Sequence, residues 1–79
     1  MSLTYCDIIL NIMVALIRVE KTSNEYADLL ILEDIAHGFN GSISADIDGL
    51  LKAFRDKTHL IVSLEDLYVY FSNMGVFKV

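Results

Sequence analysis

The chain has a single cysteine, Cys6, among its 79 residues, so no disulfide can form within it. A domain of this length buries only about 60–65% of the surface that its unfolded chain exposes. Small domains therefore often gain stability from disulfides, a metal ion or an oligomeric partner. The candidate zinc ligands are Cys6, His37, His59 and carboxylates, and they do not fall at ligand spacing. We expect no metal and no cofactor, which leaves association as the remaining source of stability.

The apolar content of the chain favours association. Hydrophobic residues make up 54% of the sequence without counting glycine, whereas average domains contain about 45–50% with glycine included. A small domain has little interior in which to bury such an excess. The sequence therefore predicts a homo-oligomer, most simply a dimer. Its expected self-association residues lie in the first two helical segments: Ile8, Ile12, Met13, Leu16, Leu30 and Ile31.

The richest apolar stretch runs from Ile8 to Ile17 and does not suggest a membrane protein. Its length is about half of what is needed to span a bilayer. No basic segment precedes it and no small-residue cleavage site follows it, so a signal peptide is not expected. A lone cysteine fits a reducing compartment. We expect a cytoplasmic protein without a membrane span.

The pattern of apolar and polar residues predicts one all-α domain over residues 1–79, a small four-helix bundle-like fold. The chain has no proline, and Gly, Ser and Thr separate four segments with helical apolar spacing. The expected helices run over Tyr5–Val19, Asn24–His37, Ala45–Asp56 and Ser63–Asn73. The expected N-caps are Thr4, Ser23 or Asn24, Ser44 and Ser63, because a short polar side chain there accepts a hydrogen bond from a first-turn amide.

The four segments differ in how much apolar surface they carry. Ile47, Leu50, Leu51 and Phe54 form one narrow arc, which indicates a surface helix with one buried face. The first two segments are apolar in almost every direction, so they must be covered on most sides. The short stretch from Leu60 to Val62 is expected to be a buried loop or extended piece.

Two β alternatives remain open. Leu29–Leu32 is short and apolar enough for a buried strand. Tyr68–Phe71 and Val76–Val79 could pair as a short β-hairpin across a turn that contains Asn73 and Gly75. Gly38, Asn40 and Gly41 tolerate positive φ and are expected to end the second segment.

The formal net charge is −5, and its distribution suggests the kind of partner. The thirty residues from Thr22 to Leu51 contain no Lys or Arg. They contain six acidic residues, which we predict to form a partner-binding acidic face: Glu25, Asp28, Glu33, Asp34, Asp46 and Asp48. Such a face suits a basic protein and disfavours nucleic acid, whose phosphates require cationic groups. The alternative is that these carboxylates only keep an apolar protein soluble.

The expected function is that of a small acidic protein–protein interaction or regulatory module. An enzyme is not expected, because neither His37 nor His59 has a visible nucleophile or carboxylate partner in the sequence. In size and charge alone, the chain is analogous to phage-encoded inhibitors that occupy a nucleic-acid-binding surface.

A DNA-binding regulator is the alternative function. Ile35-Ala36, then Gly41 and Ile47, resembles a helix-turn-helix over roughly residues 31–55, with a connection one residue longer than usual. The tail from His59 onward would then serve as the wing of a winged-helix protein. The recognition helix would present Asp46 and Asp48 to the groove, where they would repel phosphates. The segment Asp46-Ile47-Asp48-Gly49 also resembles part of an EF-hand loop, but Arg55 stands where the bidentate Glu should be.

Overall fold

The computed structural model describes residues 2–39 and 44–79, and every regular element in these two ranges is a helix. The helices are α1 (Tyr5–Arg18), α2 (Asn24–Gly38), α3 (Ile47–Thr58) and α4 (Leu64–Asn73). The all-α prediction is confirmed. Neither described range contains a strand, so the β-hairpin and the Leu29–Leu32 strand are not formed. Tyr68–Phe71 lies inside α4, where its apolar residues follow helical spacing. Of the residues expected to end the second segment, Asn40 and Gly41 lie outside the described residues.

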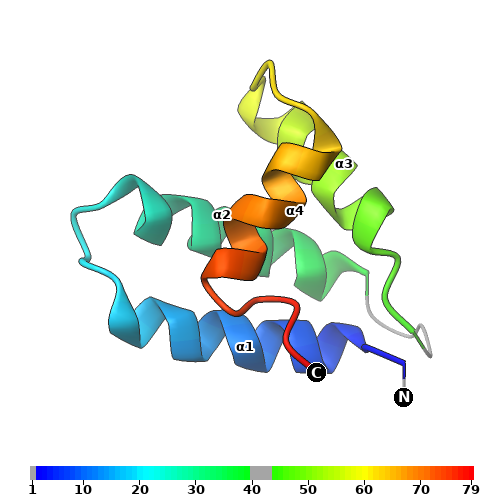
Figure 1. Ribbon diagram of the computed structural model, residues 1–79, viewed down its shortest axis with the longest axis horizontal. Helices are drawn as coiled ribbons and strands as arrows, with labels where there is room; N and C mark the ends of the chain where they lie inside the picture. The colour runs from blue at the N-terminus through cyan, green and yellow to red at the C-terminus, as the bar shows by residue number, and fades with distance from the viewer. Residues whose placement is uncertain (1, 40–43) are drawn as a thin grey trace.

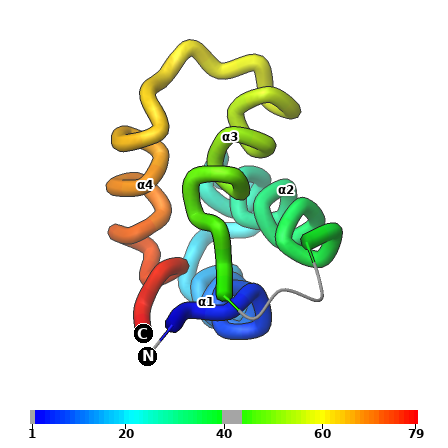
Figure 2. Tube along the Cα trace, turned by 90° about the vertical axis from the view of Figure 1, so that its right-hand side faces the viewer, coloured from blue at the N-terminus to red at the C-terminus, as the bar shows by residue number. Residues whose placement is uncertain are grey.

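Each helix contacts the next one along the chain. The helices α1 and α2 form an antiparallel hairpin, and α3 and α4 form a second hairpin that is inclined to the first (Figure 1). The view in Figure 2 shows α3 and α4 rising from the α1–α2 pair, with the C-terminal segment returning beside α1. The fold is therefore built from sequential helix contacts and short connections.

The core lies where the two hairpins meet. Fourteen apolar side chains are buried there, and they come from all four helices and the C-terminal turn: Tyr5, Ile8, Ile12, Ala15, Leu29, Leu32, Ala36, Leu50, Leu51, Phe54, Leu67, Phe71, Val76 and Phe77. The rings of Phe54 and Phe71 meet edge to face, with centroids 5.0 Å apart and planes at 89°. This geometry is favourable because the positive ring edge meets the negative ring face.

The start of α1 is a complete capping box. The Thr4 hydroxyl accepts a hydrogen bond from the Asp7 backbone N–H at 3.1 Å, and Asp7 Oδ2 accepts one from the Thr4 backbone N–H at 3.0 Å. These contacts satisfy two amides that the helix leaves unpaired. They also stabilise the charged carboxylate, so the pKa of Asp7 is lowered, chiefly by the backbone hydrogen bond from Thr4.

The start of α3 differs from the prediction by two residues. The N-cap is Asp46, whose Oδ1 accepts a hydrogen bond from the Gly49 N–H at 3.0 Å. Ser44, the predicted cap, is exposed and precedes the helix. A Cβ at Gly49 would lie 2.5 Å from Asp46 Oδ2, so glycine allows this close approach. The sequence predicted Ser44 alone as the cap. A tie to α1 favours Asp46 instead, because the Asp46 N–H donates to Tyr5 Oη at 3.0 Å.

The end of α3 places the loop that follows it differently from the prediction. His59 takes a left-handed conformation with φ of 56°, which stops the helix at Thr58. The chain then turns through residues 60–62 to reach α4. Leu60, Ile61 and Val62 were expected to be buried, but all three are exposed, and Ile61 is 100% exposed. The loop stands at the tip of the second hairpin (Figure 1), where no other helix covers it.

The end of α4 returns the chain to α1. The Val76 N–H donates to the Phe71 carbonyl at 3.1 Å and the Gly75 N–H donates to the Ser72 carbonyl at 3.0 Å, which together form a Schellman motif. Gly75 has φ of 84°, a conformation that glycine adopts without strain. The amide of Asn11 on α1 then donates to the carbonyls of Val76 and Lys78 at 2.9 and 2.8 Å. The prediction that Gly75 ends the helix is confirmed, and the last residues are held against α1.

The assignment of the α3 cap can be tested with two alanine variants. Asp46→Ala removes the acceptor for the Gly49 N–H and should lower the free energy of unfolding by about 1 kcal/mol. Ser44→Ala is the matched control and should change it by less than about 0.5 kcal/mol. Urea denaturation followed by circular dichroism measures both values. A larger loss for Ser44→Ala than for Asp46→Ala would contradict the assignment.

Candidate functional site

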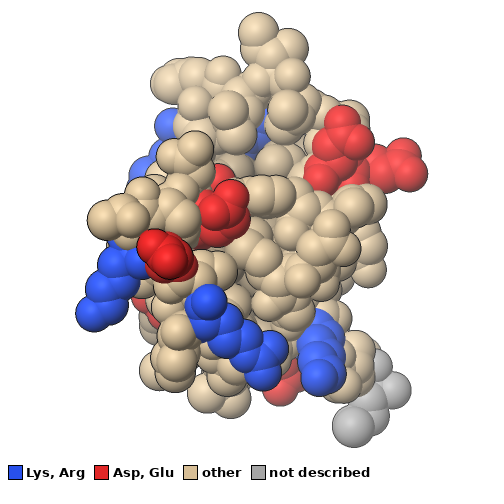
Figure 3. Space-filling model, turned by 60° about the vertical axis from the view of Figure 1, so that its left-hand side comes forward, with Lys and Arg blue, Asp and Glu red and all other residues tan. Residues whose placement is uncertain are grey.

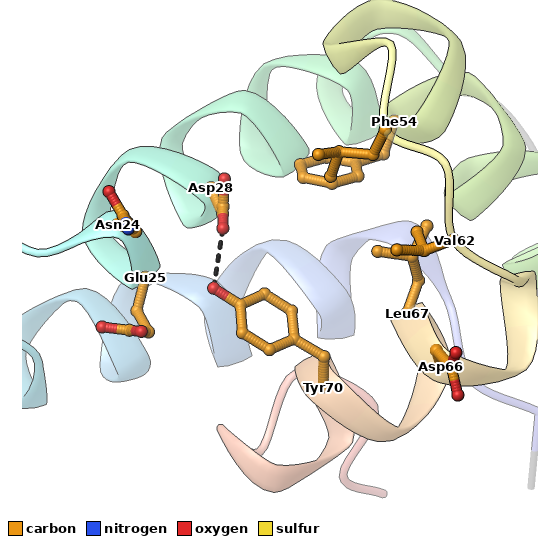
Figure 4. A pocket seen from close by; sticks show the side chains of 9 residues that line it. Asn24, Glu25, Asp28, Phe54, Val62, Asp66, Leu67 and Tyr70 are labelled. Carbon is orange, nitrogen blue, oxygen red and sulfur yellow. Dashed lines mark hydrogen bonds between the residues drawn. The ribbon is translucent and has the colours of Figure 1, made fainter.

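A cleft of about 410 Å³ lies between the start of α2, the α3–α4 loop and α4. Its size is near the lower end of the range of ligand pockets. Nine residues line it: Asn24, Glu25, Asp28, Phe54, Leu60, Val62, Asp66, Leu67 and Tyr70. Figure 4 shows Phe54, Val62 and Leu67 around one side of the open space, with Asp28 and Tyr70 on the other. We refer to this hollow as the α2–α4 cleft.

The polar side of the α2–α4 cleft is organised by one hydrogen bond. Tyr70 on α4 donates its hydroxyl to Asp28 Oδ2 on α2 at 2.7 Å (Figure 4). Burial raises the pKa of the Tyr70 hydroxyl well above its usual range, and the hydrogen bond and the negative charges of Asp28 and Glu25 raise it further. Tyr70 therefore stays protonated and holds the Asp28 carboxylate in place.

The charged groups that line the α2–α4 cleft are all anionic. Glu25 and Asp66 stand at its edges on α2 and α4, and none of the nine lining residues is Lys or Arg. The Arg55 guanidinium, which is not among the lining groups, donates a hydrogen bond to the carbonyl of the lining residue Val62 at 3.3 Å. The cleft thus combines an apolar floor with acceptors for positive charge.

The predicted acidic face is divided by the fold. Asp34 Oδ2 lies 3.2 Å from Lys57 Nζ, and Asp46 serves as the cap of α3. Nine residues separate Glu25 from Asp34, and at about 100° per residue this places them on opposite sides of α2. Asp34 and Asp46 are therefore engaged with partners outside the α2–α4 cleft.

Of the remaining four, only Glu25 and Asp28 line the α2–α4 cleft. Glu33 is half-buried on α2, and Asp48 is exposed in the first turn of α3. Figure 3 shows a face of the molecule on which anionic and cationic side chains are interspersed and separated by broad areas of other residues. The structure thus replaces one large acidic face with a small acidic cleft.

Asp66 was not predicted as a residue of the cleft. An Asp three residues after the Ser63 N-cap can also be explained locally, as the second half of a capping box. Only one half of that box is among the hydrogen bonds of the described residues: the Ser63 hydroxyl accepts from the Asp66 backbone N–H at 3.0 Å. The carboxylate remains at the cleft edge. Tyr70 was not predicted as a residue of the cleft either. Its pairing with Asp28, 42 residues away, has no local signal in the sequence.

The predicted self-association residues also separate into groups. Ile8 and Ile12 are completely buried in the core, so neither side chain is on the surface of this fold. They lie on the same side of α1 as Tyr5 and Ala15, which are also buried. Leu16 and Ile31 are half-buried against the core, whereas Met13 and Leu30 are exposed.

Three other predicted features can be placed in the structure. Among the described residues, no three His, Cys, Asp or Glu side chains gather as a metal ion would require. No helix of the described chain is long and apolar enough to cross a bilayer. The tail from His59 onward, which was proposed as a wing, contains the helix α4. The prediction of a winged-helix arrangement is therefore wrong.

Comparison with known proteins found no matching family model, no similar curated protein and no similar solved structure. The functional argument therefore depends on the geometry of the chain itself.

The environment of Tyr70 predicts an unusual tyrosine titration. The chain has four tyrosines, and the pKa of Tyr70 is raised in the folded state. Alkaline titration followed by tyrosinate absorbance should show one component above the ordinary range near about 10. Tyr70→Phe should remove that component, and Asp28→Asn should move it to lower pH, because the negative charge beside the Tyr70 hydroxyl is lost. Because folding raises the pKa of Tyr70, the contribution of this hydroxyl to the free energy of unfolding should be complete below about pH 10. It should be lost as pH rises further.

Proposed function

We propose that this chain is a protein-interaction module that receives a cationic side chain of a basic partner protein in the α2–α4 cleft. The observation that carries the proposal is the pairing of Asp28 and Tyr70 at one side of an apolar cleft whose charged lining is entirely acidic. Arginine fits this environment best, since its guanidinium can bond to a carboxylate and stack on a tyrosine ring.

The apolar part of the cleft supports the same kind of partner. Phe54 and Leu67 form a buried floor, and Leu60 and Val62 add exposed apolar surface at the mouth. The aliphatic stem of an arginine or lysine can lie on such a floor while its charged end reaches the carboxylates. Ile61, fully exposed beside them, offers a further contact to apolar residues that flank the cation in the partner.

A matched pair of peptides tests the proposal. The first is a fluorescent amphipathic helical peptide with a central arginine flanked by leucines, and the second carries neutral citrulline in place of that arginine. The arginine peptide should bind about tenfold more tightly, because a hydrogen bond to a charged group contributes roughly 1.5–3 kcal/mol. Fluorescence anisotropy measures both affinities. Equal binding of the two peptides would rule out recognition of the cation.

Two neutralising variants locate the binding site. Asp28→Asn removes the charge that Tyr70 holds and should reduce the preference for arginine to about threefold or less. Asp48→Asn removes one negative charge outside the cleft and should leave the preference unchanged. Circular dichroism and urea denaturation confirm that both variants are folded. If both variants weakened binding equally, the attraction would come from net charge and not from the cleft.

A further inference from the structure

Helix α1 carries a second apolar face that the fold leaves uncovered. Leu10, Met13, Val14 and Ile17 are all exposed, with Leu10 at 59% and Ile17 at 85%. They lie at positions i, i+3, i+4 and i+7, so they share one side of the helix. We refer to these four residues as the α1 stripe. The buried residues of α1 occupy the opposite side, which leaves the α1 stripe facing outward.

The spacing in the α1 stripe is that of a helix-pairing seam. The exposed Cys6 lies four residues before Leu10, and the intervals from Cys6 through Leu10 and Met13 to Ile17 are four, three and four residues. Alternating steps of three and four residues are the heptad spacing, which averages about 3.5 residues over a full repeat and keeps a seam facing a neighbouring helix. No charged residue occurs between Ile8 and Ile17.

We propose that a second copy of this chain covers the α1 stripe, with the two α1 helices antiparallel about a two-fold axis. The charges of α1 select this partner and this direction. Asp7 and Arg18 are the only charged residues of the helix, and they stand at its opposite ends. They are eleven residues apart, which at about 100° per residue places them within roughly 20° of each other beside the stripe.

Antiparallel pairing brings each Asp7 opposite the Arg18 of the other copy, and the two-fold axis generates this contact twice. The helix dipoles are also opposed in this arrangement, which is favourable. Parallel pairing would instead place each Asp7 level with the Asp7 of the other copy, on the opposite flank of the seam, and would keep Asp7 and Arg18 at opposite ends of the dimer. In the antiparallel register, Leu10 meets Met13 of the second copy and Cys6 meets Ile17.

The C-terminal segment lies along one flank of the α1 stripe. Asn11 holds the carbonyls of Val76 and Lys78 against α1, and Val79 is 82% exposed beside Leu10. Val79 adds apolar surface at the flank of the α1 stripe. Lys78 is also at this flank, and its long side chain can direct its charge to solvent. The proposed dimer uses a surface separate from the α2–α4 cleft, so neither proposal depends on the other.

The first experiment measures the molecular mass of the chain in solution. Light scattering after size exclusion, over a dilution series of the wild-type chain, should give a dimer that dissociates on dilution. Ile17→Glu places a charge in the α1 stripe and should raise the dimer dissociation constant by at least about tenfold. Val69→Glu changes an exposed apolar residue on α4, outside the α1 stripe, and should leave the dissociation constant unchanged. A wild-type monomer at all concentrations, or equal effects of the two variants, would overturn the proposal.

The second experiment determines the helix direction by disulfide trapping. Residues 6 and 17 of one α1 are about 16 Å apart along the helix, which is too far for a disulfide within one chain. In the antiparallel dimer, Ile17→Cys should therefore cross-link to Cys6 of the other copy under mild oxidation. The double variant with Cys6→Ser and Ile17→Cys should not cross-link.

The opposite result identifies a parallel dimer. In that case the wild-type chain would cross-link through its two Cys6 side chains, and the double variant would cross-link through its two new thiols at residue 17. Either observation would overturn the antiparallel arrangement. Non-reducing electrophoresis, with the same samples after reduction as the control, distinguishes the two patterns.

Discussion

The edge-to-face contact between Phe54 and Phe71 joins α3 to α4 at the centre of the core, and the distinctive features of the structure are arranged around it. Phe54 also forms the floor of the α2–α4 cleft. The carbonyl of Phe71 anchors the Schellman motif that turns the C-terminal segment back to α1. One aromatic pair therefore connects the second hairpin, the candidate binding cleft and the end of the chain. Because both rings are completely buried, neither can move without disturbing the core.

Helix α1 shows how a small domain leaves apolar surface uncovered. Its inner side packs on α2 and on the C-terminal turn, and its outer side bears the α1 stripe. Four short helices cannot cover both sides, since surface is large relative to volume in a chain of this size. The exposed loop at residues 60–62 has the same origin, because it lies at the tip of a hairpin beyond the reach of the other helices. Both surfaces are available to other chains, but they are at different places in the fold.

The candidate cleft could be predicted only in part. The sequence indicated an acidic centre, and Glu25 and Asp28 do line the α2–α4 cleft. It could not show that Asp34 pairs with Lys57 or that Asp46 is used as a cap, because these roles depend on where the helices lie relative to one another. Nor could it show that Asp66 and Tyr70 approach α2. Tyr70 and Asp28 are 42 residues apart along the chain, and only the tertiary fold brings the Tyr70 side chain within hydrogen-bonding distance of α2.

The sequence by itself determined the helices, because apolar spacing, capping side chains and the absence of proline are local properties that act within a few residues. It also determined that Gly75 would end the last helix and that apolar surface would exceed what the interior can hold. Only the tertiary structure decided which side of each helix is buried. For a helix that is apolar in nearly every direction, such as α1, periodicity cannot distinguish the inner side from the outer one. The neighbours of α1 bury Ile8 and Ile12 and leave Leu10 and Ile17 exposed, since the hairpins meet on that side alone.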